Sequence, residues 1–396
     1  MRYTIGEMAE IIDGDRGKNY PQQHEFLDEG YCLFLNTGNV TKVGFSFDSN
    51  QFISKEKCDL LRKGKLQRHD IVYTTRGTVG NAAYYSDSIP YEHVRINSGM
   101  VIIRPKEAIV CTEFLYQILK SDYYRPFFRK HCTGSAQPQL PIKNFSTIEL
   151  DLPDLPVQCR IAGILSTYDD LIENNQKQIK LLEEAAQRLY KEWFVALRFP
   201  GHETTPIADG IPDGWEIQTL SQIADVVMGQ SPKSEFYNQD RQGLPFHQGV
   251  GSYGTRFVID TTYSTSFTRI AEAGSILFSV RAPVGRLNIT KNKIVIGRGL
   301  AAINHRSGMQ SYLFYLLKER FFKDNIIGNG AIFASISKDE LLGQKFIVPV
   351  DDLVKRFNTV VSDIDGKIAG LENQIMLLTE ARDRLLPKLM SGEIEV

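Results

Sequence analysis

Two arginines stand at matching places in the sequence, each in a glycine-containing turn after a run of β-branched and aromatic residues. Arg76 lies in DIVYTTRGTVG and Arg281 lies in SILFSVRAPVG. Such a run predicts a strand, so each arginine is expected at a turn that follows a strand. A planar guanidinium at such a turn can bind a phosphate or the edge of a guanine base. Because the position recurs in both halves of the chain, we favour phosphate binding or a structural role over base reading.

Further basic residues follow Arg281 in a stretch without acids. No Asp or Glu occurs between Glu272 and Glu319, and none occurs between Asp122 and Glu149. Basic side chains in such stretches can contact phosphates, and the alternative is a solvated strand edge. Glutamine amides can also bond adenine edges. The candidates for nucleic-acid contact are therefore Arg76, Gln137, Gln139, Lys143, Arg281, Arg286, Lys291, Lys293 and Arg298.

The sequence offers no recognisable catalytic motif. It has no glycine-spaced phosphate loop, no dinucleotide-binding glycine pattern, and no Pro-Pro dipeptide of the kind that amino-methyltransferases carry. Its 7 histidines lack metal-ligand spacing and its 5 cysteines form no C-x-x-C pair, so we expect no metal site and reduced thiols in a cytoplasmic protein. No apolar run approaches the roughly 18 residues that would cross a membrane.

The second half of the chain repeats the first. The sequence from Pro153 aligns without a gap with the sequence from Pro349, at an offset of 196 (349 minus 153). Asp169 recurs as Asp365 in this alignment, among other identities. Two copies that each fill about half the chain exclude a solenoid and predict a molecule with two-fold pseudosymmetry.

The repeated segments have the pattern of long coiled-coil helices. Apolar residues recur at alternating spacings of four and three over more than four heptads, and the alternative, two core helices of separate domains, rarely shows such strict spacing. A polar residue interrupts the seam once in each copy, at Asn175 and at Arg382. The predicted seam residues are Ile161, Leu165, Ile172, Asn175, Ile179, Leu182, Leu189, Phe357, Val361, Ile364, Ile368, Leu371, Ile375, Leu378, Leu385 and Leu389.

The remaining segments predict two mixed α/β domains. Short apolar runs between Gly, Asn and Pro indicate strands, and residues 113–130 and 310–326 are typical of amphipathic helices. The two segments resemble each other only in traces, such as TIGEMAEIIDG and TLSQIADVVMG. We therefore expect an α/β fold with two recognition-type domains separated by an antiparallel pair of long helices. The predicted bounds are 1–152 for the first domain, 153–200 for the first helix region, 206–347 for the second domain and 348–396 for the second helix region.

Five segments together resemble the specificity subunit of Type I DNA restriction–modification enzymes. The resemblance covers the whole chain and the order of its parts, and it is most specific in the helical segments. The segments are LPDLPVQCRIAGIL (152–165), KEWFVALRFPG (191–201), IPDGW (211–215), GSAQPQL (134–140) and RLLPKLMSGEI (384–394).

The resemblance implies a subunit that has no catalytic site and that binds double-stranded DNA. In this family each target recognition domain reads one half of a split, asymmetric target, and the coiled coil sets the unread spacer. Two modification subunits, which bind S-adenosylmethionine and methylate adenine N6, are the implied partners. Restriction subunits that use ATP and Mg can join them.

Two other functional classes are compatible with parts of the sequence. A stand-alone DNA-binding or scaffolding protein would have the same architecture without a methyltransferase partner. A self-contained methyltransferase–nuclease is disfavoured because the catalytic motifs are missing. Neighbouring genes for a methyltransferase and a helicase-like nuclease would distinguish the first alternative from the specificity subunit.

Overall fold

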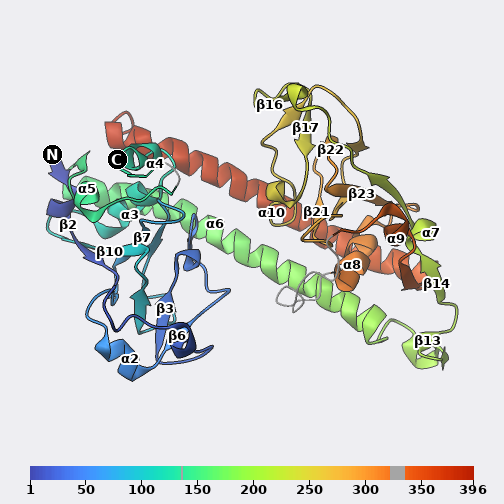
Figure 1. Ribbon diagram of the computed structural model, residues 1–396. Coiled ribbons are helices and arrows are strands. Elements are labelled where there is room, and N and C mark those ends of the chain that lie inside the picture. The colour runs from blue at the N-terminus through green and yellow to red at the C-terminus, as the bar shows by residue number, and fades with distance from the viewer. Residues whose placement is uncertain (135–136, 322–334) are drawn as a thin grey trace. The chain divides into compact units, whose positions relative to one another are not determined.

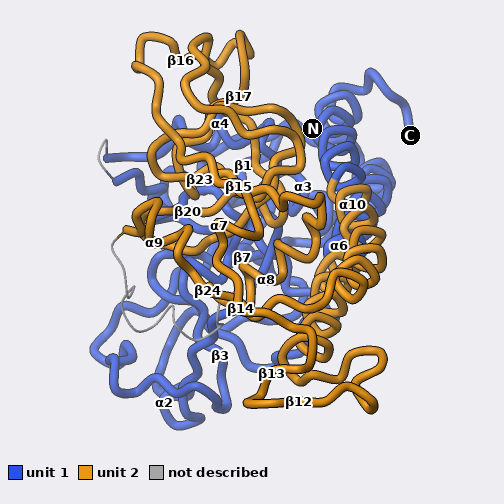
Figure 2. The backbone as a smooth tube through the Cα atoms, turned by 90° about the vertical axis from the view of Figure 1, so that its right-hand side faces the viewer, with its two compact units in different colours: residues 1–176, 373–396 blue, residues 177–372 orange. Residues whose placement is uncertain are grey.

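The chain folds into two compact units in the computed structural model, which describes all residues except 135–136 and 322–334. Unit 1 consists of Met1–Gln176 together with Asn373–Val396, and unit 2 consists of Lys177–Glu372 (Figure 2). Each unit therefore combines one globular segment with parts of both repeated segments.

Two long helices run through the repeated segments. They are α6 (Leu155–Tyr190) and α10 (Asp351–Ser391), drawn in green and in orange to red in Figure 1. A π-helical turn, Lys191–Val195, follows α6 directly. The two acids that begin α10, Asp351 and Asp352, lie in its first turn, where a negative charge interacts favourably with the positive end of the helix dipole.

The expected fold class, two α/β domains with two long helices that pair in opposite directions, is confirmed.

The globular segment of unit 1 alternates short strands with short helices. Its first helix begins with a capping box in which Thr4 and Glu7 bond each other's backbone N–H groups. The elements are β1 (Arg2–Thr4), α1 (Ile5–Met8), β2 (Ala9–Asp13), β3 (Cys32–Leu35), β4 (Val40–Thr41), β5 (Gly44–Phe45), β6 (Phe52–Ile53), α2 (Lys55–Leu60), β7 (Ile71–Thr74), β8 (Ala82–Tyr84), β9 (Val94–Ile96), β10 (Met100–Pro105), α3 (Thr112–Lys120), α4 (Arg125–Arg129), α5 (Ile142–Ser146) and β11 (Glu149–Asp151).

The globular segment of unit 2 follows the same plan. A second capping box, formed by Thr219 and Gln222, begins the corresponding helix and explains the resemblance between TIGEM and TLSQI. The elements are β12 (Ile207–Ala208), β13 (Ile211–Pro212), β14 (Glu216–Thr219), α7 (Leu220–Ile223), β15 (Ala224–Met228), β16 (Tyr237–Asn238), β17 (Leu244–His247), β18 (Tyr263–Ser264), β19 (Ile270–Ala271), β20 (Ile276–Ser279), β21 (Leu287–Ile289), β22 (Ile294–Ile296), β23 (Leu300–His305), α8 (Gln310–Phe321), α9 (Lys338–Leu342) and β24 (Lys345–Val348).

The main sheets of the two units have the same strand order. The order is β2-β10-β7-β8 in unit 1 and β15-β23-β20-β21 in unit 2, and every pair is antiparallel. The register also corresponds, because Met100 lies opposite Thr74 and Leu300 lies opposite Ser279. All residues of β7 and β20 are buried, which explains why both strands are continuous β-branched and aromatic runs. The repeat seen in the helices therefore extends through both globular segments.

A second sheet in each unit is where the two copies differ. Unit 1 has the three-stranded order β6-β3-β9 and unit 2 has the five-stranded order β16-β18-β17-β22-β19. Each contains one parallel pair, β3 with β9 and β17 with β22. The common core of the repeat is thus the main sheet with its helices, and the second sheet carries the divergence.

The two long helices pack against each other within each unit, in opposite directions. In unit 1 the beginning of α6, with Ile161, shares a hydrophobic core with Leu389 near the end of α10. In unit 2 the end of α6 meets the beginning of α10, with the rings of Tyr190 and Phe357 5.7 Å apart. Every predicted seam residue is buried or half-buried, the half-buried ones being Leu182, Leu189, Ile364, Ile375, Leu378 and Leu385.

Both polar interruptions of the seam have a partner in unit 1. The Asn175 amide Nδ2 donates to Oε1 of Gln374 at 3.2 Å, and Nη1 of Arg382 lies 2.8 Å from Oδ1 of Asp169. Asn175 is buried, so this amide pair can fix the register of the helix pair, because a shift would leave the Asn175 amide without a partner.

Asp169 is the most heavily bonded acid of the helix pair. Its carboxylate accepts hydrogen bonds from Gln117 and Lys120 of α3 as well as from Arg382. Burial alone would raise the pKa of Asp169, but these donors outweigh burial and the pKa lies below its ordinary value of 3.8. The ionised carboxylate therefore stabilises the folded state.

We expect Asp169→Asn to lower the free energy of unfolding at pH 7 by about 1–3 kcal/mol, because the cations of Lys120 and Arg382 lose the carboxylate to which they are bonded. A depressed pKa means that the stabilisation is present above 3.8 and is lost as the pH falls through the folded-state pKa. The difference between parent and variant should consequently shrink below pH 3.8. Urea unfolding across this pH range measures it, with the exposed neighbour Asp170→Asn as control. A difference that stayed constant with pH would contradict the assignment.

Candidate nucleic-acid interface

The turn that carries Arg76 is held by a threonine at the end of β7. The Thr74 hydroxyl donates to the Thr78 carbonyl at 2.5 Å and accepts from the Asn81 N–H at 2.9 Å. The Gly80 N–H donates to the Thr74 carbonyl at 3.0 Å. Gly80 has a φ of 100°, which a residue with a side chain rarely adopts. The turn is thereby closed on itself, with Arg76 near its start.

The turn that carries Arg281 uses the same bonds. The Ser279 hydroxyl donates to the Pro283 carbonyl at 2.6 Å and accepts from the Arg286 N–H at 2.8 Å. The Gly285 N–H donates to the Ser279 carbonyl at 3.0 Å. The equivalence of Arg76 and Arg281, which the sequence predicts, is therefore a structural fact, and it applies to the backbone of the turn as well as to the arginine.

A neighbouring loop lies against each turn. In unit 1 the N–H groups of Thr75 and Arg76 both donate to the Gly99 carbonyl, at 2.9 and 3.1 Å. In unit 2 the Val280 N–H donates to the Gly299 carbonyl at 2.9 Å. The second loop contains Arg298, so unit 2 brings two of the predicted arginines to the same end of its main sheet.

Close backbone contact explains a glycine that both copies share. A side chain at Gly14 would meet the Asn97 carbonyl oxygen at 2.3 Å, and one at Gly229 would meet the Gly297 carbonyl oxygen at 2.2 Å. Both distances are impossible for a Cβ atom. The glycine that ends TIGEMAEIIDG and TLSQIADVVMG thus allows the first strand of the sheet to reach the loop beside the arginine turn.

The segment containing the two predicted glutamines also reaches the turn of unit 1. The Leu140 N–H donates to the Thr75 carbonyl at 2.9 Å, and Gln139 pairs with Thr133 through two backbone bonds. Gln137 and Gln139 are exposed. Ser135 and Ala136 of the GSAQPQL motif lie outside the described residues.

In unit 2 the corresponding contact is made by Ile336, whose N–H donates to the Val280 carbonyl at 3.0 Å. Ser335 pairs with Arg281 in an isolated bridge. Residues 330–334 of the matching GAIFASIS segment lie outside the described residues. Each turn therefore contacts two other segments: the loop at Gly99 or Gly299, and the segment at Leu140 or Ile336.

The remaining predicted residues differ in how they are placed. Arg281, Arg298 and Lys143 are exposed, and Arg76 and Arg286 are half-buried. Lys143 belongs to α5 and does not take part in the turn. All these residues stay predictions as DNA contacts. By exposure and position, Arg281 and Arg298 are the best placed to contact a ligand in unit 2.

The two lysines of the predicted basic stretch point to carboxylates of their own unit. The Lys291 ammonium lies 3.6 Å from Glu372 Oε2 and 4.8 Å from the centre of the Phe257 ring. The Lys293 ammonium lies 3.0 Å from Glu272 Oε1. A lysine with a carboxylate partner must exchange that partner to bind a phosphate, so these lysines rank behind the two arginines as candidates.

The sequence interpretation missed one basic residue of the site in unit 1. Nη2 of Arg16 lies 3.1 Å from Asp13 Oδ1 and 3.3 Å from the Ser98 carbonyl, and the side chain is 46% exposed. Ser98 belongs to the loop that contacts Arg76. The sequence feature that could have indicated Arg16 is DGDRG, which overlaps the end of the repeated segment TIGEMAEIIDG.

The described residues show no metal-holding cluster, and the contacts of His247 do not form a hydrolytic triad. These residues include no group of three His, Cys, Asp or Glu side chains that would hold a metal ion. His247 contacts Ser252 and Asp260 at 2.7 and 2.9 Å, but through Nδ1 and Nε2 respectively, the reverse of a hydrolytic triad. The imidazole is buried, and it links the ends of a loop rather than facing a substrate. None of the helices in the described part of the chain is both long and apolar enough to cross a membrane.

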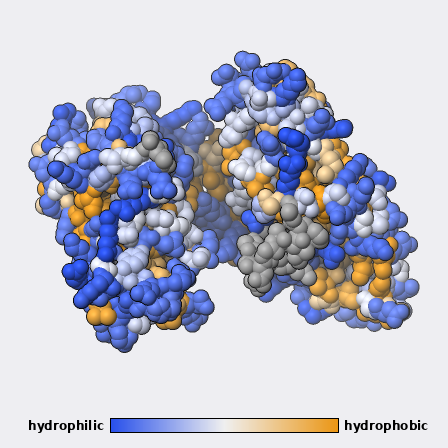
Figure 3. Space-filling model, viewed as in Figure 1, coloured by the Kyte–Doolittle hydropathy of each residue, from blue (hydrophilic) through white to orange (hydrophobic). Residues whose placement is uncertain are grey.

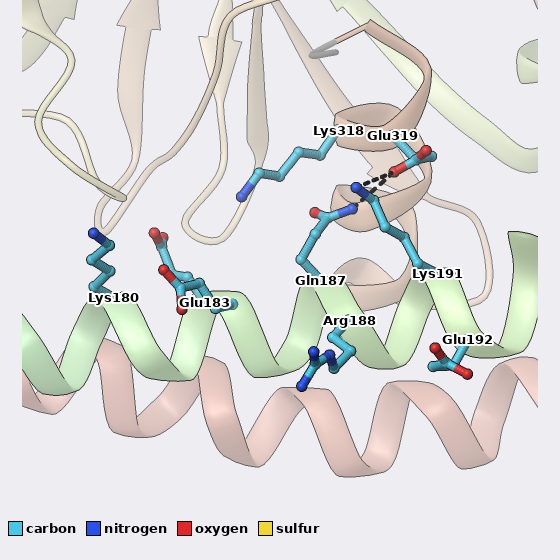
Figure 4. Close-up of a pocket in the computed structure, with 9 residues that line it drawn as sticks. Lys180, Glu183, Gln187, Arg188, Lys191, Glu192, Lys318 and Glu319 are labelled. Carbon is cyan, nitrogen blue, oxygen red and sulfur yellow. Dashed lines mark hydrogen bonds and ion pairs between the residues drawn. The ribbon is translucent and has the colours of Figure 1, made fainter. Parts of the chain in front are cut away.

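A groove of about 480 Å³ lies in unit 2 between α6 and α8 (Figure 4). Its walls carry both signs of charge. Glu319 accepts a hydrogen bond from Gln187 at 3.0 Å and forms an ion pair with Lys191 at 4.0 Å. Such mixed charge does not favour a phosphate backbone. None of the predicted contact residues lines it; the lining residues are Lys180, Glu183, Glu184, Gln187, Arg188, Lys191, Glu192, Lys318 and Glu319.

The surface in Figure 3 is mainly hydrophilic, with smaller apolar areas between the polar ones. With a net charge of −1, the chain as a whole has little attraction for a polyanion. Binding to DNA would therefore depend on local groups of basic residues such as those at the arginine turns.

The chain matches the sequence model of the Type I restriction modification DNA specificity domain over residues 1–184 and 212–376. It is 28% identical, over 342 residues, to the specificity subunit of the Type I restriction enzyme MjaIX of Methanocaldococcus jannaschii, with 82% of this chain and 78% of that protein covered. It is 23% identical, over 471 residues, to the specificity subunit of the enzyme HindI of Haemophilus influenzae, with 98% and 100% covered.

A solved structure shares the fold. It is the S subunit of a Type I restriction–modification system from M. genitalium, which aligns with a TM-score of 0.57 at 16% identity. The alignment covers 98% of this chain and 96% of that one.

We expect Arg281→Ala and Arg298→Ala each to remove one phosphate contact. The slope of log K for DNA binding against log salt concentration should then fall in magnitude by about 0.9 for each variant. The slope is measured by titrating duplex DNA at a series of salt concentrations. Arg306→Ala is the control, because Arg306 pairs with Asp225 beyond the other end of β23. A parent-like slope for both the Arg281 and the Arg298 variant would show that these arginines do not contact the DNA backbone.

Proposed function

Because the chain belongs to the Type I restriction–modification DNA specificity family, we propose that it reads a bipartite, asymmetric DNA target for a partner adenine-N6 methyltransferase. The specificity subunits among its relatives make the chain a recognition subunit rather than a catalytic one. Each globular segment would read one half of the target, and the paired helices would set the unread spacer between the halves.

The duplicated arginine turn is the observation that best supports this proposal. A protein that reads two different half-sites needs the same backbone contact twice and different base contacts beside it. Arg76 and Arg281 occupy turns with the same hydrogen bonds. The flanking residues differ, because unit 1 presents Arg16 and two glutamines where unit 2 presents Arg298. The shared turn suits a phosphate contact, and the two glutamines of unit 1 suit contacts to bases.

The partners follow from the same proposal. Two modification subunits would bind S-adenosylmethionine and transfer its methyl group to adenine N6. Restriction subunits, where they join, would supply ATP- and Mg-dependent cleavage. This chain would hold none of these cofactors and would contribute DNA recognition and docking surfaces.

We expect the purified chain to transfer no methyl group to DNA, and to direct methylation to a single sequence once a modification subunit is added. Incorporation of labelled methyl groups into duplex DNA, followed by sequencing of the modified sites, measures both. Methyl transfer by the chain alone would contradict the proposal. Specific binding with no modification subunit able to associate would favour a stand-alone DNA-binding protein.

We also expect each globular segment to determine one half-site independently. Exchanging residues 1–152 for the corresponding segment of another family member should change one half of the methylated sequence and leave the other half and the spacer unchanged. Exchange of residues 206–347 is the reciprocal experiment and should change only the other half. If either exchange altered both half-sites, the segments would not read separately.

A further inference from the structure

A buried arginine connects the globular segment of unit 2 to both long helices. Arg256 is 2% exposed and its guanidinium lies 3.6 Å from the centre of the Phe314 ring of α8. Its Nη2 lies 2.5 Å from Asp365 Oδ1 of α10, and its Nη1 lies 3.8 Å from Glu183 Oε1 of α6. One planar group therefore contacts three helices at once.

The backbone around Arg256 belongs to the sheet side of the segment. The Arg256 carbonyl accepts from the Ile289 N–H at 3.0 Å, and the Val258 N–H donates to the Ile289 carbonyl at 3.1 Å. Val258 packs in the core formed by residues of β20, β22 and β23. The Arg256 N–H also donates to Glu372 Oε1 of α10 at 3.1 Å. Movement of this loop relative to the helices would therefore break the contacts of Arg256.

Burying these charged groups costs free energy in the folded state. Among the described residues, neither Nε nor Nη1 of Arg256 has a hydrogen-bond acceptor. Burial raises the pKa of Asp365 and that of Glu372 despite the cation beside them. Buried ion pairs can often be replaced by apolar side chains without loss of stability. A role in fixing geometry accounts for the pair better than a role in stability.

In unit 1 the equivalent acid pairs with different cations. Asp169, which matches Asp365 in the repeat, is neutralised by Lys120 of α3 and by Arg382 of α10. In unit 2 the guanidinium that pairs with Asp365 comes from a loop attached to the sheets of the globular segment, in addition to the charge of Lys318 on α8. Among the contacts of the described residues, Asp365 therefore connects α10 directly to a loop of the globular segment, whereas Asp169 connects α6 to α3 and α10.

We propose that Arg256 and Asp365 are positioning residues that fix the orientation of the second globular segment on the long helices, and thereby the spacer length that the protein accepts. The inference rests on the proposed reading of a split target. An orientation that is rigidly held admits one separation of the half-sites, whereas a loosened one admits neighbouring separations.

The test compares binding of the assembled complex to its own target and to targets whose spacer is one base pair longer or shorter. The variants are Arg256→Met, which keeps length without charge, and Arg256→Met with Asp365→Leu, which also removes the carboxylate that pairs most closely with the guanidinium. We expect both to fold and to lose about tenfold in discrimination between spacers, which corresponds to about 1.4 kcal/mol, with both half-site sequences unchanged. Arg256→Lys, which keeps the charge but not the planar group, should lose less.

The control is Arg306→Met, which removes an exposed arginine of the same unit, 53% exposed and paired with Asp225. It should discriminate as the parent does. Parent-like discrimination in both Arg256 variants would overturn the positioning role. So would their failure to fold, because the pair would then serve stability. If the parent bound all spacers equally, the split-target proposal itself would fall, and the positioning role with it.

Discussion

The apolar seam of the long helices constrains the rest of the structure. Neither α6 nor α10 can bury its seam alone, because a lone helix leaves that face in water. Each helix instead covers the other within each unit, and each globular segment packs on the same pair. The acids at the repeated position, Asp169 and Asp365, are half-buried where helix and globular segment meet. Their compensation by basic side chains is a consequence of that packing.

The sequence predicted those features that depend on local pattern. Heptad spacing predicted both helices, and every predicted seam residue is buried or half-buried. The similarity of TTRGTVG to SVRAPVG predicted equivalent turns, because the turn is closed by residues only a few positions apart. The resemblance of TIGEM to TLSQI has a local cause in the same sense, the capping boxes at Thr4 and Thr219, which were not among the features predicted from the sequence.

Features that depend on distant contacts could not be predicted. Nothing near Arg256 in the sequence indicates that its guanidinium is buried, because its partners are at least 58 positions away (314 minus 256). The carboxylate partner of Lys291 is equally remote in sequence, so the basic stretch appeared uniform. The long amphipathic segment after residue 112 divides into α3 and α4 rather than forming one helix. Arg16 reaches its loop through Ser98, a contact that no spacing rule indicates.

The division of the chain into units has a consequence for synthesis on the ribosome. Unit 2 is continuous, from Lys177 to Glu372, whereas unit 1 needs Asn373–Val396 to complete its core around Leu386 and Leu389. The segment that emerges first is therefore the one that is finished last. Until residues 373–396 have been made, the core around Ile161 lacks its residues from α10, and apolar surface left exposed in this way is prone to aggregate. A nascent chain of this design has a reason to engage a chaperone, or a protein bound for the same complex, before its own release.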